Sequence, residues 1–199
     1  YDPAAPYAGG TGPIALGDRP FGLEVNGDRL YYSLWNEDMF NASSLVNNEI
    51  WSVELDGTGN PIASTETLEI VLPDLHAFGS EMYSSPVADI DFSPTGTMIL
   101  GERTQGDITT LIATHARVLE YECVDGTWMP STNVFHIGEN YVSYANAAGG
   151  VDANETNVWA SADAMHLGSG GDLMWGMQGL PRTGGTIASS FLIDYNDDL

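Results

Sequence analysis

Lysine is absent from this sequence of 199 residues, and its positive charge comes from five arginines alone. Against them stand 28 aspartates and glutamates, which give a formal net charge of −23 at pH 7. Nucleic-acid binding depends on clustered Lys and Arg side chains that displace counterions from phosphates, and docking on an anionic membrane surface depends on similar clusters. The composition therefore argues against nucleic acids and anionic membranes as partners.

Long apolar runs and cysteine pairs are lacking too. No stretch approaches the roughly 18 apolar residues of a membrane-spanning helix, so we expect no membrane insertion. The single cysteine, Cys123, excludes an internal disulfide, and its place in an alternating segment predicts a buried thiol. Dense carboxylates keep a protein hydrated and soluble, and we expect an extracellular or cell-surface location.

The sequence does contain enough apolar material for a core, since 43% of it is hydrophobic and 10% aromatic. Its 23 glycines and 10 prolines fall in short clusters that are typical of turns, which favours an all-β chain. Segments 21–33 and 87–100 each read as strand, tight turn and strand. Segments 50–57 and 118–126 each read as one alternating strand that ends in Asp-Gly.

These segments form a repeat. Gly27 and Gly96, in the two tight turns, are 69 residues apart, and so are Gly57 and Gly126, in the two Asp-Gly pairs. Two independent landmarks with one spacing predict a duplicated unit of about four short strands. A third copy is blurred: 191–198 falls where the alternating strand would recur.

The hairpin of the third copy has two candidates. One is segment 149–162 and the other is segment 170–176, and the sequence does not decide between them. The insertions 34–49 and 102–117 both fall between the second and third strands of a unit. They are therefore expected on one rim, where repeat proteins often carry a binding face.

Four-stranded units in tandem are typical of the blades of a β-propeller. We therefore expect an irregular N-terminal segment at 1–19 and about three blades of four antiparallel strands in 20–199. A ring closes with about four to eight blades, so about three make an incomplete ring, part of a larger propeller. The alternative is a two-sheet β-sandwich with a coincidental repeat.

The strings RPFGLEV, PVADIDFSPTGTMILGER, VLEYEC and GLPRTGGTIASSFLID carry a resemblance that spans residues 20 to 198. The blades resemble those of NHL- and YWTD-type propellers. The whole resembles the propeller-like head of large bacterial cell-surface proteins that carry SdrD B-like, immunoglobulin-type repeats. This resemblance implies an adhesin or envelope component and offers no catalytic residues. The sequence itself lacks an immunoglobulin-type repeat.

Two acidic loops are candidate calcium sites. Asp194, Asn196 and Asp198 place side-chain oxygens at alternate positions, as the first half of a calcium loop does. Asp152 and Asn154 lie in a second acidic loop that follows two glycines. The alternative for both is an acidic turn, because Asp and Asn populate turns without any metal.

Candidate partner-binding residues lie in the insertions. Trp35 opens the first insertion, with Met39 and Phe40 close behind. Exposed aromatics there would bind a glycan or another protein, and packing within the loop is the alternative. Self-assembly is a further expectation for the module. Glu102 and Arg103 begin the second insertion, and we also expect them to form a local ion pair.

No nucleophile motif, zinc spacing or phosphate loop is present, so we expect a non-enzymatic structural or interaction module for adhesion or assembly. The alternative is a calcium-dependent hydrolase of the lactonase type. In that case Glu24, Asp89, Asp91 and Asn157 would converge on a metal at the axis of the ring.

Overall fold

The computed structural model describes residues 19–35, 47–73, 84–105, 115–139, 145–166 and 173–195. Within these ranges the chain is all-β, apart from one turn of 3₁₀ helix, η1 (Ile187–Ser189). The expected segment 1–19 therefore lies outside the described residues except for Arg19, which begins the first strand. Met39, Phe40, Asn196 and Asp198 lie outside them as well.

The described strands form three antiparallel sheets of four, each made of consecutive strands, and none of these sheets closes on itself. Sheet 1 contains β1 (Arg19–Asn26), β2 (Arg29–Trp35), β3 (Glu49–Glu54) and β4 (Thr67–Val71). Sheet 2 contains β5 (Val87–Phe92), β6 (Met98–Glu102), β7 (Val118–Val124) and β8 (Thr127–Pro130). Sheet 3 contains β9 (Ala147–Ala153), β10 (Asn157–Ala162), β11 (Gly176–Pro181) and β12 (Phe191–Asp194).

Glycines with positive φ make the tight turns that the sequence predicts. Gly27 (φ 64°) turns β1 into β2, Gly96 (φ 85°) lies between β5 and β6, and Gly126 (φ 79°) lies between β7 and β8. An L-residue with a Cβ rarely adopts this conformation, so the three positions punctuate the meander. They explain why the first two repeats are legible in the sequence.

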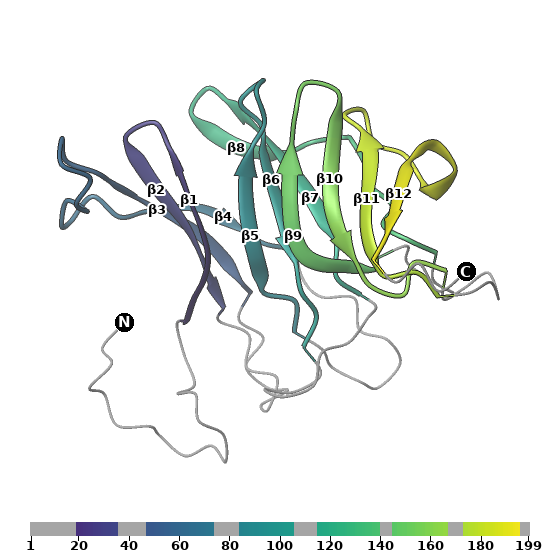
Figure 1. Cartoon of the computed structure of the whole chain (residues 1–199). Helices are drawn as coiled ribbons and strands as arrows, with labels where there is room; N and C mark the ends of the chain where they lie inside the picture. Colours follow the sequence, from purple (N-terminus) through teal and green to yellow (C-terminus); the bar gives the residue numbers. More distant parts are fainter. Residues whose placement is uncertain are drawn as a thin grey trace, which may run out of the picture.

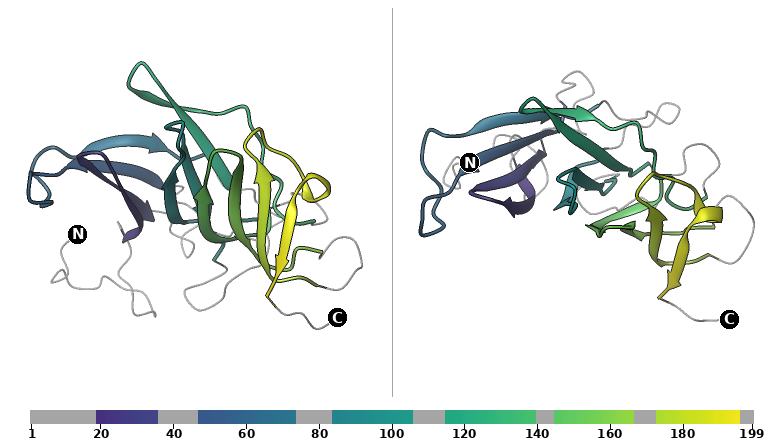
Figure 2. Two further views of the ribbon diagram at one scale, coloured as in Figure 1. Left: turned by 45° about the horizontal axis from the view of Figure 1, so that its top comes forward. Right: turned by 90° about the horizontal axis from the view of Figure 1, so that it is seen from above.

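The sheets lie side by side in chain order, and the first strand of each lies beside the first strand of the next (Figure 1). Away from the first strands the contact between sheets 1 and 2 becomes sparser, although β4 still touches β8. Figure 2 gives two further views of the row of sheets. The close approach depends on small residues. A Cβ on Gly22 would come within 2.9 Å of the Ala88 backbone, and one on Gly101 within 2.5 Å of the Gly149 carbonyl oxygen.

The core is divided into two layers, one on each face of sheet 2. Strand β6 is buried along its whole length. Its Met98 and Leu100 point toward sheet 1 and pack with Ile50 and Ile70, whereas Ile99 points toward sheet 3 and packs with Val158. Because neighbouring residues of a strand point to opposite faces, one strand serves both layers.

Two sequence expectations are wrong. Segment 191–198 contains the fourth strand of sheet 3, β12, and not the third, which is β11; the sequence GMQGLP of β11 lacks the alternation that marks its counterparts. Of the two hairpin candidates, 149–162 is the one that forms a hairpin, β9–β10.

Cys123 is exposed and not buried, because β7 runs beyond the core over its last three residues.

Replacing Ile99 by Ala tests the layer between sheets 2 and 3. Ile99 is fully buried there, so its truncation should lower the free energy of unfolding by about 2–5 kcal/mol. Val124→Ala, at an exposed position of the same sheet, is the control and should change it by less than about 0.5 kcal/mol. Urea unfolding measures both, and equal effects would contradict the two-layer core.

Stability should also decline at alkaline pH because of Tyr31 and Tyr121, which lie in the layer between sheets 1 and 2. Burial raises the pKa of both phenols above their ordinary value. Their contribution is therefore complete below pH of about 10, the pKa in the unfolded chain, and is lost as the pH rises through the folded-state pKa. Thermal unfolding between neutral pH and pH of about 11 should show a flatter decline for the double Tyr→Phe variant than for Tyr195→Phe.

Candidate functional site

The first calcium candidate is only partly described. Asp194 ends β12, and Asn196 and Asp198 lie outside the described residues. In the second candidate, Asp152 lies on β9, and the side-chain oxygen of Asn154 accepts the N–H groups of Thr156 and Asn157, each at 2.9 Å. Asn154 thus stabilises the turn between β9 and β10, as Asn commonly does.

The carboxylates expected at the axis are engaged with the backbone of the neighbouring sheet. Asp89 accepts the N–H of Val151 through Oδ2 at 3.0 Å. Burial raises the pKa of Asp91, and the nearby carboxylates of Asp152 and Glu24 raise it further. Across the ranges that the structure describes, no three His, Cys, Asp or Glu side chains gather closely enough to hold a metal ion.

Asn157, the fourth residue of the lactonase hypothesis, lies on β10. Its side-chain amide donates to the carbonyl of Leu180 on β11 at 3.2 Å, and its Oδ1 accepts the hydroxyl of Thr156. Asn157 therefore acts within its own sheet.

Trp35 is not an exposed aromatic residue. Its side chain is 5% exposed, and its indole N–H donates to the Ser84 hydroxyl at 2.7 Å. The guanidinium of Arg19 lies 4.7 Å from the centre of its ring, and Phe21 packs edge-on against it. Trp35 ends β2 facing sheet 2, which is why it is buried there and is not presented to a partner.

The expected pair between Glu102 and Arg103 does not form, because adjacent residues of an extended chain point to opposite sides. Glu102 is buried and accepts two bonds from the Arg117 guanidinium, at 2.6 and 2.7 Å. Arg103 pairs instead with Asp163 at 3.1 Å. Both residues belong to internal contacts and not to an exposed rim.

Every guanidinium in this sequence without lysine has a partner inside the protein. Four pair with carboxylates and one lies over an aromatic ring, so the described surface is left with little positive charge. The pairs are Arg29–Glu54, Arg103–Asp163, Arg117–Glu102, Arg182–Glu120 and Arg19 over Trp35.

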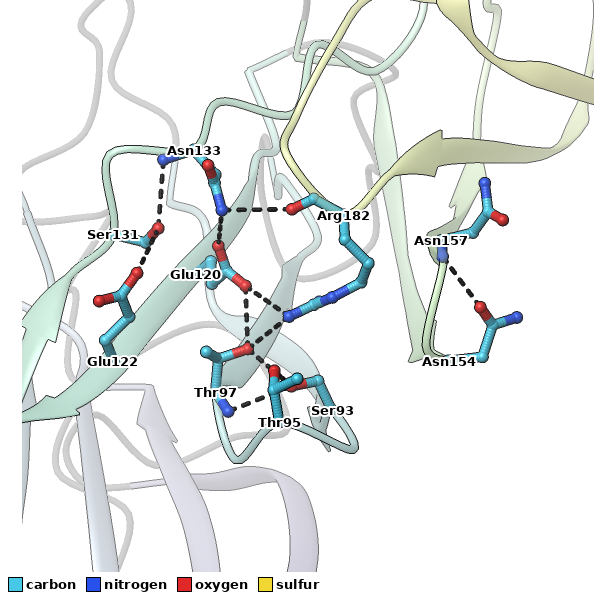
Figure 3. A network of polar contacts seen from close by, with 10 residues as sticks. All are labelled: Ser93, Thr95, Thr97, Glu120, Glu122, Ser131, Asn133, Asn154, Asn157 and Arg182. Atoms are coloured by element: carbon cyan, nitrogen blue, oxygen red, sulfur yellow. Dashed lines mark hydrogen bonds and ion pairs between the residues drawn. The ribbon is translucent and has the colours of Figure 1, made fainter.

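The pair between Glu120 and Arg182 is the centre of a network that joins sheet 2 to sheet 3 (Figure 3). Glu120 accepts the Arg182 guanidinium at 2.8 Å and the Asn133 amide at 2.7 Å. Thr97 donates to the same carboxylate at 2.9 Å and accepts from Arg182 at 2.8 Å. The Glu120 side chain is 1% exposed, so the network compensates for the burial of its charge.

A cavity of about 640 Å³ lies between β4 and the β7–β8 side of sheet 2. Its lining includes Arg117 and Glu120, which are neutralised by Glu102 and Arg182 as described above. Most of its other lining side chains are apolar. The lining of the cavity does not indicate one class of ligand.

The exposed faces at the two ends of the row of sheets are the stronger candidate site. We call the face of a sheet toward the next sheet its front face and the opposite one its back face. The first two strands of each sheet share one register shift, and we use it to decide which residues of the three sheets occupy equivalent positions. The shift lies opposite Ser33 in sheet 1, near Gly101 in sheet 2 and opposite Ser161 in sheet 3. The back face of sheet 1 and the front face of sheet 3 are the end faces.

The back face of sheet 1 carries an uncharged row across all four strands. The row consists of Leu23, Tyr32, Trp51 and Leu68, which pair in register and therefore share one face. Leu23 is 63% exposed and Leu68 is 43% exposed. The equivalent positions on sheet 2, Ile90 and Leu100, are completely covered by sheet 1.

The front face of sheet 3 shows the same contrast. Met177 on β11 pairs with Ser161 on β10 and with Ile193 on β12, so the three residues share this face. Met177 is 44% exposed and Ile193 is 47% exposed. The equivalent residues on sheet 1 are Ile50, which pairs with Ser33, and Ile70, which pairs with Ile50. Both are buried against sheet 2. Both end faces therefore have the composition of an internal contact between sheets, but no sheet formed by the described residues covers them.

Sequence reasoning missed both the ion-pair network and the end faces. Arg182 lies in a segment that reads as a turn, although the scarcity of positive charge was a signal that each arginine has a specific partner. Leu23 looks like an ordinary strand residue, and Met177 lies in a segment without clear alternation. Only the order of the sheets shows that none of the described sheets covers them.

In comparisons with known proteins, no family model, curated protein or solved structure matches the chain. In the described residues, no helix is long and apolar enough to cross a membrane.

Removing the carboxylate of Glu120 tests the network. Glu120→Ala leaves the half-buried Arg182 guanidinium without its counter-charge and should lower the free energy of unfolding by about 3–5 kcal/mol. Glu122→Ala changes an exposed glutamate on the same strand and should cost less than about 1 kcal/mol. A urea titration of the two variants makes the comparison, and a loss at Glu120 no larger than at Glu122 contradicts a structural role for the network.

Proposed function

We propose that this chain is a non-enzymatic structural or interaction module of an extracellular or cell-surface protein, built as about three blades of a larger β-propeller. The observation that carries the proposal is the exposure, on both end faces, of positions that are buried between sheets elsewhere in the molecule. A surface of this kind is expected to bind protein.

Three features support the propeller architecture. Each sheet is a meander of four consecutive strands, the first strands lie next to one another, and neighbouring sheets touch more closely at their first strands than at their last. Blades that surround a central axis have this arrangement. Three such sheets leave two open faces, and further blades would cover them.

The distribution of charge supports a soluble module at the cell surface or outside the cell. The arginines are used in contacts within the protein, whereas acidic residues such as Asp28, Glu66 and Glu122 are exposed to solvent. Such a surface stays hydrated and repels nucleic acids and anionic lipids. The resemblance to the propeller-like heads of bacterial surface proteins points in the same direction.

The lactonase-type alternative lacks a comparable observation in its favour. It needs oxygen ligands from several blades at one point, about 2.3–2.6 Å from a calcium ion. Asp89 and Asn157 instead hold hydrogen bonds to main-chain groups. We therefore do not propose a hydrolase.

Binding of the neutral apolar dye Nile red tests whether the end faces are available in the native protein. At submicromolar concentration the folded chain should bind the dye, and a variant with Leu23→Thr, Leu68→Thr, Met177→Thr and Ile193→Thr should lose most of the fluorescence while remaining folded. Val124→Thr with Met129→Thr, at exposed positions of sheet 2, is the matched control and should retain it.

Stability measurements on matched positions complete this test. Leu23→Thr should change the free energy of unfolding by less than about 0.5 kcal/mol, whereas Ile90→Thr, at the equivalent covered position, should cost about 2–5 kcal/mol. A native chain without dye binding, or similar costs at the two positions, would show that the end faces are not open and would remove the basis of the proposal.

A further inference from the structure

We propose that the two end faces bind each other in trans, so that a second copy of this chain docks head to tail, with the front face of sheet 3 against the back face of sheet 1. This inference rests on the proposed function and adds the identity of the partner. The contact would continue the series of sheet-to-sheet contacts already present within the chain.

A serine hydroxyl shows how one such contact is made. The hydroxyl oxygen of Ser33 accepts the N–H of Gly22 at 2.8 Å, within sheet 1. Its hydrogen is donated across to the carbonyl of Val87 on β5, at 2.7 Å. Because β5 is the edge strand of sheet 2, this bond satisfies a backbone carbonyl that its own sheet leaves unpaired.

Ser161 repeats this arrangement on the open front face of sheet 3. Its hydroxyl oxygen accepts the N–H of Gly150 at 2.7 Å, as Ser33 accepts that of Gly22. Its own hydrogen reaches the carbonyl of Gly150 at 3.3 Å, within the same sheet, whereas Ser33 makes the shorter bond to the next sheet. The Ser161 hydroxyl would therefore gain a shorter hydrogen bond if the first strand of another sheet lay beside it.

The back face of sheet 1 offers that acceptor. Pro20 pairs with Leu34 as Val87 pairs with Glu102, so Pro20 occupies on β1 the position that Val87 occupies on β5. The strand β1 is the edge of its sheet. In the proposed contact, the Ser161 hydroxyl of one copy donates to the Pro20 carbonyl of the other copy.

The apolar rows match in the same way. Within the chain, Ile50 and Ile70 of a front face pack in one layer with Ile90 and Leu100 of a back face. Between copies, Met177 and Ile193 would correspond to Ile50 and Ile70, and the row that contains Leu23 would correspond to Ile90 and Leu100. The two rows are uncharged, which matters in a chain with a net charge of −23.

The chemistry of the faces favours a head-to-tail arrangement over a symmetric one. Within the chain, the front-face serine Ser33 donates to the first strand of the sheet whose back face covers it, and front against back repeats this arrangement, whereas front against front does not. Such a heterologous contact closes into a ring or continues as a filament. Two copies contain six sheets, which is within the number that closes a propeller.

Sedimentation equilibrium of the purified chain tests the inference. In about 0.5 M salt, which screens the repulsion between copies, the wild type at tens of micromolar should have twice the mass of the 21.3 kDa chain. Front-face variant Met177→Asp and back-face variant Leu23→Asp should each be monomeric, and Met129→Asp, outside both end faces, should behave as wild type. Ser161→Ala should weaken association roughly 2- to 10-fold.

The decisive measurement is a mixture of the two monomeric variants. The Leu23→Asp copy retains an intact front face and the Met177→Asp copy an intact back face, so a 1:1 mixture should form a heterodimer. Larger polymers of the wild type that both variants abolish would support the same contact in an open chain. A wild-type dimer that Leu23→Asp leaves intact would overturn the head-to-tail arrangement.

The inference and the proposed function fail in different ways. A wild-type chain that stays monomeric but binds Nile red on its end faces would overturn the second copy as the occupant and leave the faces for the further blades of the proposed function. A monomeric chain that binds no dye would overturn both.

Discussion

A four-stranded sheet with apolar residues on both faces needs a neighbour on each side, and this requirement governs the whole molecule. Sheet 2 meets it fully: Leu100 faces one core layer and Ile99 the other. Sheets 1 and 3 meet it on one face only. The contrast between Ile90, which is covered, and Leu23, which is open, comes from the place of each sheet in the row and not from a difference in chemistry.

Ion pairs add specificity to this packing. In a chain without lysine, a buried carboxylate can be neutralised only by an arginine or by other hydrogen-bond donors. Arg182 reaches Glu120 across the contact between sheets 2 and 3, and Arg117 reaches Glu102 within sheet 2. Because an unpaired buried charge is costly, these pairs select one alignment of the strands that carry them.

The sequence was sufficient for the all-β class and for the hairpins of the first two sheets, because Gly27 and Gly96 mark turns by a local requirement for positive φ. It was insufficient where the environment decides. Trp35 and Glu102 look like surface residues next to insertions, yet tertiary packing buries both. The equivalence of Ser33 and Ser161 depends on register shifts, which no local pattern reveals.

The absence of crossovers within the sheets has a consequence for biosynthesis. Each sheet uses four consecutive strands, so all the strands that pair within it have left the ribosome before the strands of the next sheet. The N-terminal part of a chain is synthesised first, so sheet 1 has Ile50 and Ile70 uncovered until β5 and β6 emerge. The nascent chain is therefore most in need of chaperone protection in the interval between one completed meander and the first hairpin of the next.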